Sequence, residues 1–219
     1  MSNNSTFIKS EIGYFKNNRS EMLKYIPENA VNILEVGCGE GNFISLLKSD
    51  ERELWGVEMN DLAAQKATEV CKFVLSGDFD SVYEQLPAYH FDCIIFNDVL
   101  EHLYTPQEVI RRVKTLLSPT GVLVVSIPNF RFISNLIEIL IEGEFRYKPE
   151  GGILDDTHIR FFTKKSMKRM FEEEGYKVLT QEGIRERNDW KMKLIYVLSF
   201  GKMNDARYVN FAMVAKPLI

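Results

Sequence analysis

The sequence of 219 residues lacks a long apolar run, a large net charge and a regular cysteine pattern. No stretch stays apolar for the roughly 20 residues that a membrane-spanning helix needs. The first residues also lack the positive start and apolar core of a signal peptide. Its cysteines, Cys38, Cys71 and Cys93, are scattered and odd in number, which argues against a disulfide framework. We therefore expect a cytoplasmic protein with reduced thiols.

The charge balance and the length also limit the kinds of partner and the number of domains to expect. The formal net charge is −4, so nothing indicates a broad, non-specific attraction to nucleic acid or to an anionic membrane. No repeat or low-complexity segment interrupts the chain, and its length suits one α/β domain with a buried sheet. We expect residues 1–219 to form a single domain with no stable nucleic-acid partner.

The most informative segment is residues 32–43, NILEVGCGEGNF, where an apolar strand runs into alternating glycines and then a helical pattern. Glycines permit unusual backbone angles and let the chain approach a ligand closely. Glu58 ends a second apolar strand about twenty residues beyond the loop, where a carboxylate accepts hydrogen bonds from both ribose hydroxyls of an adenosine. The pattern predicts a nucleotide-like ligand at this loop.

The glycine spacing is G-x-G-x-G, with Glu35 two residues before the first glycine. This spacing differs from the G-x-G-x-x-G of dinucleotide-binding oxidoreductases and so argues against that class of enzyme. It resembles motif I of the class I S-adenosylmethionine-dependent methyltransferases, which release S-adenosylhomocysteine. The resemblance implies these cofactor-binding residues: Glu35, Gly37, Gly39 and Gly41 at the methionine part, Glu58 at the ribose with Met59 after it, Asp78 and Phe79 at the adenine, and Asn97 near the reacting methyl.

Apolar runs with strand character alternate with helical periodicity, which predicts βαβ units around a mainly parallel sheet. The resemblance implies an α/β, Rossmann-like fold with seven strands, helices on both faces and a C-terminal antiparallel hairpin. We expect an N-terminal helical cap at 8–27 and substrate-side insertions at 143–159 and 184–207. Strands are predicted near 31–37, 53–58, 73–76, 91–97, 121–127, 176–183 and 208–215, and helices near 10–25, 41–49, 61–71, 106–117, 130–142 and 164–175, the last capped by Thr163.

Further motifs follow the fourth predicted strand. The pair Glu101-His102 resembles ubiquinone-pathway O-methyltransferases, many sugar and natural-product methyltransferases, and small-RNA ribose methyltransferases. The run His158-x-Arg-x-Phe-Thr163 resembles methyltransferases of cell-surface polysaccharide biosynthesis. Together they imply O-methylation of a sugar or glycan precursor. The acceptor would be a small molecule, a sugar nucleotide or a lipid-linked glycan.

Two of the three histidines fall in these segments. The acceptor oxygen must lose a proton as it attacks the methyl, and imidazole titrates near the working pH. We therefore take His158 as the first candidate for the base and His102 as the second. In the alternative interpretation, His102 only fixes a helix start and His158 only anchors its loop. Arg160, whose guanidinium suits a phosphate, Asn129 and Tyr14 are the predicted substrate-binding residues.

A metal site is an alternative hypothesis for the same segments. Asp98, Glu101 and His102 have i, i+3 and i+4 spacing, and His158 comes from the later loop. This ligand set suits Mn²⁺, Fe²⁺ or Zn²⁺ better than Mg²⁺. Our main prediction has no metal. The alternative is a metal-dependent catechol or RNA ribose O-methyltransferase, although the ribose enzymes have Glu where Asp98 stands.

Two further questions stay open at this level. The chain also resembles accessory proteins of methionine biosynthesis with the same fold, which leaves a non-catalytic partner protein as an alternative. The apolar segment Trp190–Phe200 is compatible with a lid helix, a homodimer contact, a surface for a lipid-linked substrate, or a short helix that covers the sheet.

Overall fold

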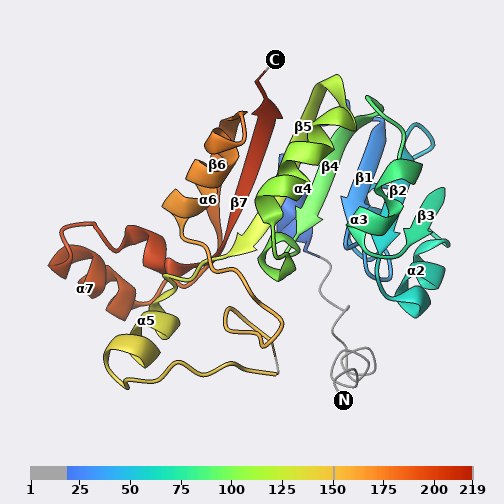
Figure 1. Ribbon diagram of the computed structural model, residues 1–219. Coiled ribbons are helices and arrows are strands. Elements are labelled where there is room, and N and C mark those ends of the chain that lie inside the picture. The colour runs from blue at the N-terminus through green and yellow to red at the C-terminus, as the bar shows by residue number, and fades with distance from the viewer. Residues whose placement is uncertain (1–18, 150, 219) are drawn as a thin grey trace. The chain divides into compact units, whose positions relative to one another are not determined.

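A computed structural model describes residues 19–149 and 151–218 (Figure 1). The chain forms two compact units: unit 1 is Met1–Asn97 with Thr115–Gly121, and unit 2 is Asp98–Lys114 with Val122–Ile219. Among the described residues, no helix is long and apolar enough to span a bilayer. The single-domain assignment and the substrate-side role of the two insertions stay predictions.

Unit 1 is built on parallel strands, each made from a short apolar run. The central residues of two of them, such as Ile33 and Ile94, are fully buried, whereas Val74 and Leu75 in the edge strand are half-buried. Continuous apolar runs of this kind are typical of strands that are covered on both faces. In pairing order these strands are β3 (Phe73–Ser76), β2 (Glu53–Glu58), β1 (Asn32–Val36) and β4 (Phe91–Asn97).

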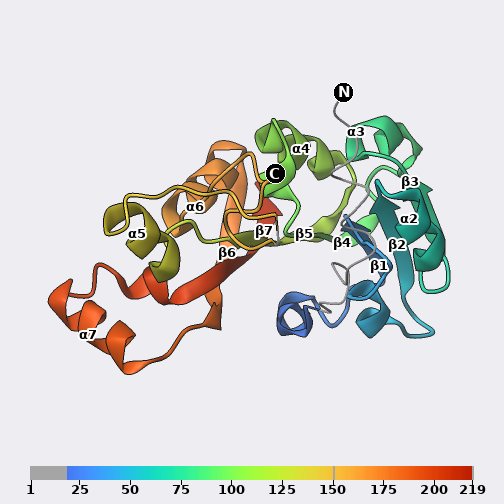
Figure 2. The same ribbon diagram turned by 90° about the horizontal axis from the view of Figure 1, so that it is seen from below.

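Short helices cover the strands of unit 1. Figure 2 shows α3 (Phe79–Val82) and the blue 3-10 helix η3 (Ser20–Tyr25) on opposite sides of them. The predicted helix at 10–25 and the cap at 8–27 otherwise lie outside the described residues. The remaining helices of this unit are η4 (Ile44–Leu47), α2 (Asp61–Ala67) and η5 (Tyr83–Gln85).

Antiparallel pairing distinguishes unit 2. The strand β7 (Tyr208–Pro217) lies between β5 (Leu117–Pro128) and β6 (Tyr176–Glu186) and runs antiparallel to both. The complete strand order is β3-β2-β1-β4-β5-β7-β6. The predicted seven-stranded, Rossmann-like sheet with a C-terminal antiparallel hairpin is therefore confirmed.

Two helix pairs accompany these strands in unit 2. Arg111 joins the first pair by a bidentate ion pair to Glu174, at 2.7 and 3.0 Å. The second pair shares a small buried cluster of Ile133, Met192 and Ala206. The pairs are α4 (Pro106–Arg112) with α6 (Lys164–Glu173), and α5 (Ile133–Leu140) with α7 (Trp190–Leu198); the short helices are η6 (Leu100–His102), η7 (Val113–Thr115) and η8 (Asn204–Arg207).

Some predicted boundaries were wrong. Instead of a helix at 41–49, η4 forms a single 3-10 turn, because the Ser45 hydroxyl donates to the Asn42 carbonyl at 2.9 Å and Lys48 is already extended. The fifth strand begins at Leu117 rather than near 121, so its Pro-Thr-Gly signal lies inside the strand. The insertion expected from 184 begins later, since β6 continues to Glu186.

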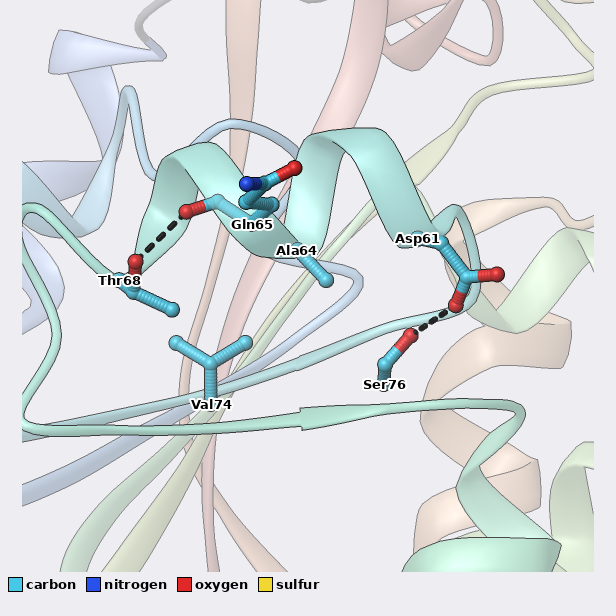
Figure 3. A pocket seen from close by; sticks show the side chains of 6 residues that line it. All are labelled: Asp61, Ala64, Gln65, Thr68, Val74 and Ser76. Carbon is cyan, nitrogen blue, oxygen red and sulfur yellow. Dashed lines mark hydrogen bonds between the residues drawn. The ribbon is translucent and has the colours of Figure 1, made fainter.

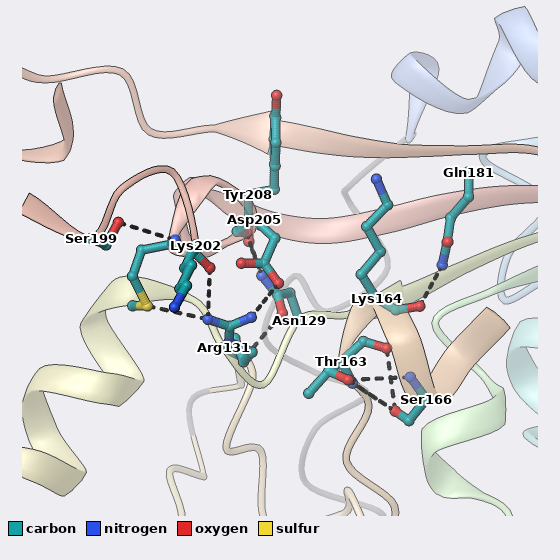
Figure 4. Close-up of polar contacts among 11 residues, drawn as sticks. Asn129, Arg131, Thr163, Lys164, Ser166, Gln181, Ser199, Lys202, Asp205 and Tyr208 are labelled. Atoms are coloured by element: carbon teal, nitrogen blue, oxygen red, sulfur yellow. Dashed lines mark hydrogen bonds and ion pairs between the residues drawn. The ribbon is translucent and has the colours of Figure 1, made fainter. Parts of the chain in front are cut away.

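The predicted cap of the 164–175 helix is confirmed. The Thr163 hydroxyl accepts the Ser166 N–H at 3.2 Å, and the Ser166 hydroxyl accepts the Thr163 N–H at 2.9 Å (Figure 4). Such reciprocal capping satisfies two backbone donors that the first helical turn leaves open. It fixes where α6 begins, directly after the His158–Thr163 segment.

We expect Thr163→Ala to lower the free energy of unfolding by about 1 kcal/mol, because it leaves an N-terminal N–H of α6 without its acceptor. Urea denaturation measures the change. Thr163→Ser keeps the hydroxyl and should stay close to the wild type. Equal losses in both variants would contradict the capping role.

Candidate functional site

The glycine-rich loop after β1 folds back over the end of β2. Gly37, Gly39 and Gly41 have φ values of 72°, 55° and 85°, in the left-handed region where a side chain is strained. The N–H groups of Gly37 and Cys38 both donate to the Val57 carbonyl, at 2.8 and 3.1 Å. The glycines are thus required by the backbone itself at this turn.

The carboxylate of Glu58 holds this loop by a hydrogen bond. Its Oε2 accepts the Gly39 N–H at 2.8 Å, and its Oε1 accepts the Asn60 N–H at 2.9 Å. Each carboxylate oxygen keeps a second lone pair, so the predicted contacts to two ribose hydroxyls are compatible with these bonds. Met59, the next residue, is 65% exposed. The sequence predicted a ligand contact for Glu58 but not its role in ordering the loop.

Glu35 is a buried acid with unused hydrogen-bonding capacity. Glu35 is only 2% exposed, and its Oε1 accepts a hydrogen bond from the Asn97 side-chain amide at 3.0 Å. Among the described residues, neither Glu35 Oε2 nor Asn97 Oδ1 has a hydrogen-bond partner. Desolvation raises the pKa of Glu35 to about 8, against the opposing effects of the Asn97 amide and the nearby Ile44 backbone N–H. Unsatisfied buried acceptors of this kind indicate a ligand with N–H donors and positive charge.

Asp78 and Phe79 stand at the start of α3, after β3. Exposed Asp78 caps the helix, because its Oδ1 accepts the Ser81 N–H at 3.0 Å. The buried Phe79 ring meets Tyr83 and Phe96 edge to face, with centroids 5.7 and 6.1 Å apart. Their contact with an adenine stays a prediction.

A neighbouring groove in unit 1 does not coincide with the predicted donor residues. It lies between α2 and β3 and has a volume of about 250 Å³ (Figure 3). The Ser76 hydroxyl donates to Asp61 Oδ1 at 2.5 Å along its wall, so these polar groups satisfy each other. The groove is lined by Asp61, Ala64, Gln65, Thr68, Val74 and Ser76.

In unit 2, Glu101, His102 and His158 come together. One ligand atom from each lies within 4.8 Å of the others, and the imidazole centroids are 4.6 Å apart, edge to face. His102 Nδ1 lies 3.2 Å from the Thr157 carbonyl, and His158 Nδ1 lies 3.0 Å from the Ile153 carbonyl. A carbonyl only accepts, so each Nδ1 carries a proton, and in the neutral form of each ring the lone pair is on Nε2.

Backbone bonds hold the loop that brings His158 to this cluster. The N–H groups of Ile159 and Arg160 both donate to the Glu101 carbonyl at 3.0 Å. Asp155 Oδ1 accepts the N–H and the hydroxyl of Thr157 at 2.8 and 2.6 Å.

Glu101 is 1% exposed, and its Oε1 lies 3.9 Å from His158 Nε2. A carboxylate at that position is placed to stabilise an imidazolium.

The predicted inclusion of Asp98 in this cluster was wrong. Asp98 has a φ of 54°, and its Oδ1 accepts the Ser126 hydroxyl at 2.8 Å and the Asn210 amide at 3.1 Å. The helical turn after the strand is the 3-10 helix η6, which begins only at Leu100. The face with i, i+3 and i+4 spacing therefore does not form.

Asn129 is a structural anchor and not an acceptor contact. It is 0% exposed, its Nδ2 donates to the carbonyls of Asp205 and Tyr208 at 2.8 and 2.9 Å, and its Oδ1 accepts the Arg131 N–H at 3.0 Å (Figure 4). These bonds leave it no surface for a ligand.

Arg160, by contrast, is exposed. Its Nε and Nη2 donate to the Tyr104 carbonyl at 3.0 and 2.5 Å, which orients the guanidinium without neutralising its charge. Nη1 of the same rigid guanidinium is a further N–H donor, so the position of Arg160 is compatible with binding of an anionic acceptor. Tyr14 lies outside the described residues.

The strand order, the glycine loop after β1 and the acid at the end of β2 together define a class I methyltransferase fold. The sequence profile of the methyltransferase domain family matches residues 8–181, so the chain belongs to that family. Its methyl donor is accordingly S-adenosylmethionine.

Two curated relatives and one solved structure show how far the similarity extends. The chain is 28% identical over 171 residues to a ubiquinone biosynthesis O-methyltransferase of Coxiella burnetii, covering 74% of this chain and 72% of the relative. It is 25% identical over 197 residues to the protein of that name from Colwellia psychrerythraea, covering 86% and 74%. A SAM-dependent methyltransferase structure from Archaeoglobus fulgidus superposes with a TM-score of 0.72 at 19% identity, covering 96% and 99%.

Glu35 makes stability depend on pH in a definite direction. Its pKa is about 8 in the folded chain against an ordinary 4.5, so between these values the folded state keeps a proton that the unfolded state releases. Its contribution to stability therefore falls as pH rises from about 4.5 to about 8. We expect Glu35→Gln to remove that fall, so its advantage over the wild type grows by roughly 1–4 kcal/mol from about pH 5 to pH 8.

Urea titrations across this pH range measure the difference. Glu174→Gln is the control, because the partner of Glu174 is the guanidinium of Arg111, which does not titrate in the range tested. Its difference from the wild type should stay constant. A constant difference for Glu35→Gln as well would refute the raised pKa.

Proposed function

We propose that the chain transfers the methyl group of S-adenosylmethionine to a hydroxyl oxygen. In this proposal unit 1 binds the donor, and Glu101, His102 and His158 of unit 2 serve the acceptor. The observation that supports it most is the pair of imidazoles whose Nδ1 atoms are held by carbonyls, which puts both lone pairs on Nε2. A neutral imidazole with an oriented lone pair suits removal of a hydroxyl proton near neutral pH.

For the donor, the buried acceptors of unit 1 suit its methionine part. Glu35 Oε2 and Asn97 Oδ1 lack partners among the described residues, and an ammonium group supplies both N–H donors and charge. Glu58 would take the ribose hydroxyls, as predicted from its position after β2. The loop glycines would let the backbone approach the donor without side chains.

For the acceptor, we propose a ring that carries the hydroxyl. Four aromatic rings, from Phe130, Phe145, Tyr147 and Phe161, form a half-exposed cluster with neighbouring centroids 5.2–6.3 Å apart. Such a surface accommodates the face of a planar ring or the C–H face of a sugar. The curated relatives are named for ubiquinone biosynthesis, which favours a hydroxylated ring on the way to a quinone, whereas the His-x-Arg-x-Phe-Thr motif favours a sugar or glycan precursor for a surface polysaccharide.

A metal-dependent version is the second candidate. Glu101, His102 and His158 offer one carboxylate and two imidazoles within 4.8 Å, a set that Mn²⁺ or Zn²⁺ accepts. Each imidazole also has its other nitrogen held by a carbonyl, as metal-ligating histidines usually do. A bound ion would lower the pKa of an acceptor hydroxyl.

Calorimetric titration with S-adenosylmethionine tests the donor site. At pH 7 Glu35 is mostly protonated, and an ammonium beside it favours the carboxylate, so binding should release up to about one proton. The measured enthalpy then depends on the ionisation enthalpy of the buffer. We expect Glu35→Gln to lose this dependence and Glu58→Ala to bind at least about tenfold more weakly. Absence of binding would refute the donor assignment.

The acceptor site is tested by formation of S-adenosylhomocysteine with panels of catechols, sugar nucleotides and glycan precursors. His158→Gln should lower turnover by about a hundredfold or more and leave donor affinity unchanged. His90→Gln is the control, since the third histidine lies in unit 1 and contacts Glu53. Turnover that EDTA abolishes and Mn²⁺ restores would select the metal-dependent version. Donor binding without turnover of any acceptor would favour a non-catalytic partner protein.

A further inference from the structure

The helix α7 is apolar on both faces. Its inner face places Met192 and Ile195 against α5. On its outer face Trp190, Val197 and Leu198 are 70%, 66% and 69% exposed. A surface helix in water normally carries polar residues on its outer face, and clustered exposed apolar side chains mark an interaction surface.

The end of α7 adds a strained aromatic residue to this surface. Phe200 N–H donates to the Val197 carbonyl at 3.1 Å, and Gly201 N–H donates to the Tyr196 carbonyl at 2.9 Å. This is the Schellman pattern, whose left-handed position usually holds glycine. Here it holds Phe200, with a φ of 51° and an exposure of 92%. The side chain thus costs stability without any burial in return, which points to a use outside the folded chain.

The charged residues within the segment 190–203 are all positive. Lys193 and Lys202 are exposed, and no acid occurs between residues 190 and 203. The acids on either side are paired: Asp189 lies 2.7 Å from Arg187, and Asp205 lies 2.9 Å from Arg131. The overall charge of −4 therefore does not describe this part of unit 2.

The neighbouring helix extends the apolar surface. α5 packs against α7, and the two lie side by side in both views of the chain (Figures 1 and 2). α5 ends in Leu140 and Ile141, which are 74% and 79% exposed. The helix pair thus presents apolar side chains from both of its members.

We propose that α7 and the turn after it form an interfacial site that docks on an anionic lipid bilayer. Trp190, Leu198 and Phe200 enter the acyl boundary, while Lys193 and Lys202 meet the headgroups. Tryptophan and tyrosine rings favour this interface. With nine residues, α7 is shorter than the roughly 20 needed to cross a bilayer, so it lies in the interface plane.

A bilayer fits this surface better than a second copy of the chain. A twofold interface brings the same patch against itself, so both copies would contribute lysines and, within residues 190–203, no acid to pair with them. Anionic headgroups supply the missing charge. The inference stands apart from the proposed methyl transfer, because lipid binding is measured without donor or acceptor.

Sedimentation with vesicles tests the proposal. The full chain should bind vesicles with 30% phosphatidylglycerol in phosphatidylcholine, bind pure phosphatidylcholine far less, and lose much of its binding in 0.5 M NaCl. Phe200→Gly should lower the bound fraction at least fivefold while raising the thermal midpoint, because it removes the apolar ring and the backbone strain together. Leu198→Ser should also weaken binding, without relief of strain.

Tyr89→Gly is the matched control. Tyr89 lies in unit 1, is 68% exposed and has a φ of 54°, so it shares the exposure and the strain of Phe200. This variant should gain stability and bind vesicles like the wild type. A Phe200→Gly variant that loses stability, or vesicle binding that is absent or indifferent to Phe200 and Leu198, would overturn the proposal. So would a dimer, seen by analytical ultracentrifugation, that Phe200→Gly dissociates.

Discussion

The carboxylate of Glu58 joins two parts of unit 1 that define its ligand-binding end. Its oxygens hold the N–H of Gly39 in the loop after β1 and the N–H of Asn60 at the start of α2. Because the loop glycines have left-handed backbone angles, this segment leaves the strand pairing, and beyond its two bonds to the Val57 carbonyl it depends on this carboxylate. One buried acid therefore orders the loop and presents lone pairs to a ligand, so loop geometry and ligand affinity depend on the same group.

The two candidate sites use buried polar groups in opposite ways. In unit 1, Glu35 and Asn97 keep acceptor atoms without partners among the described residues, and desolvation holds the pKa of Glu35 near 8. Such a site gains most from a cation that supplies the missing donors. In unit 2, carbonyls from the loop before His158 orient His102 and His158 in advance. The first site thus lacks a positively charged ligand, as suits a binding site. The second holds its two imidazoles in fixed orientations, as proton transfer requires.

The sequence predicted those features that depend on local chemistry. Apolar runs located the strands of unit 1, and Thr163 was recognised as a cap because capping needs a side chain at one position. Asp98 and Asn129 were misplaced for a different reason. Spacing cannot reveal a left-handed φ at Asp98 or a set of backbone partners for Asn129 that come from more than seventy residues away. The meeting of His102 with His158 was suggested by resemblance, but its carbonyl anchors depend on the tertiary fold.

Some residues of this chain lower the stability of the fold, and their positions indicate what the chain binds. A buried carboxyl with an elevated pKa at Glu35 and a left-handed aromatic residue at Phe200 both lower stability, and simple replacements would remove either cost. Residues that serve only the fold, such as Asn129 and Thr163, satisfy their polar groups fully or pair them reciprocally. Inconsistency between local preference and the fold is expected at functional positions. The same physical criterion therefore selects the donor site and the exposed end of α7, although one is buried and the other faces solvent.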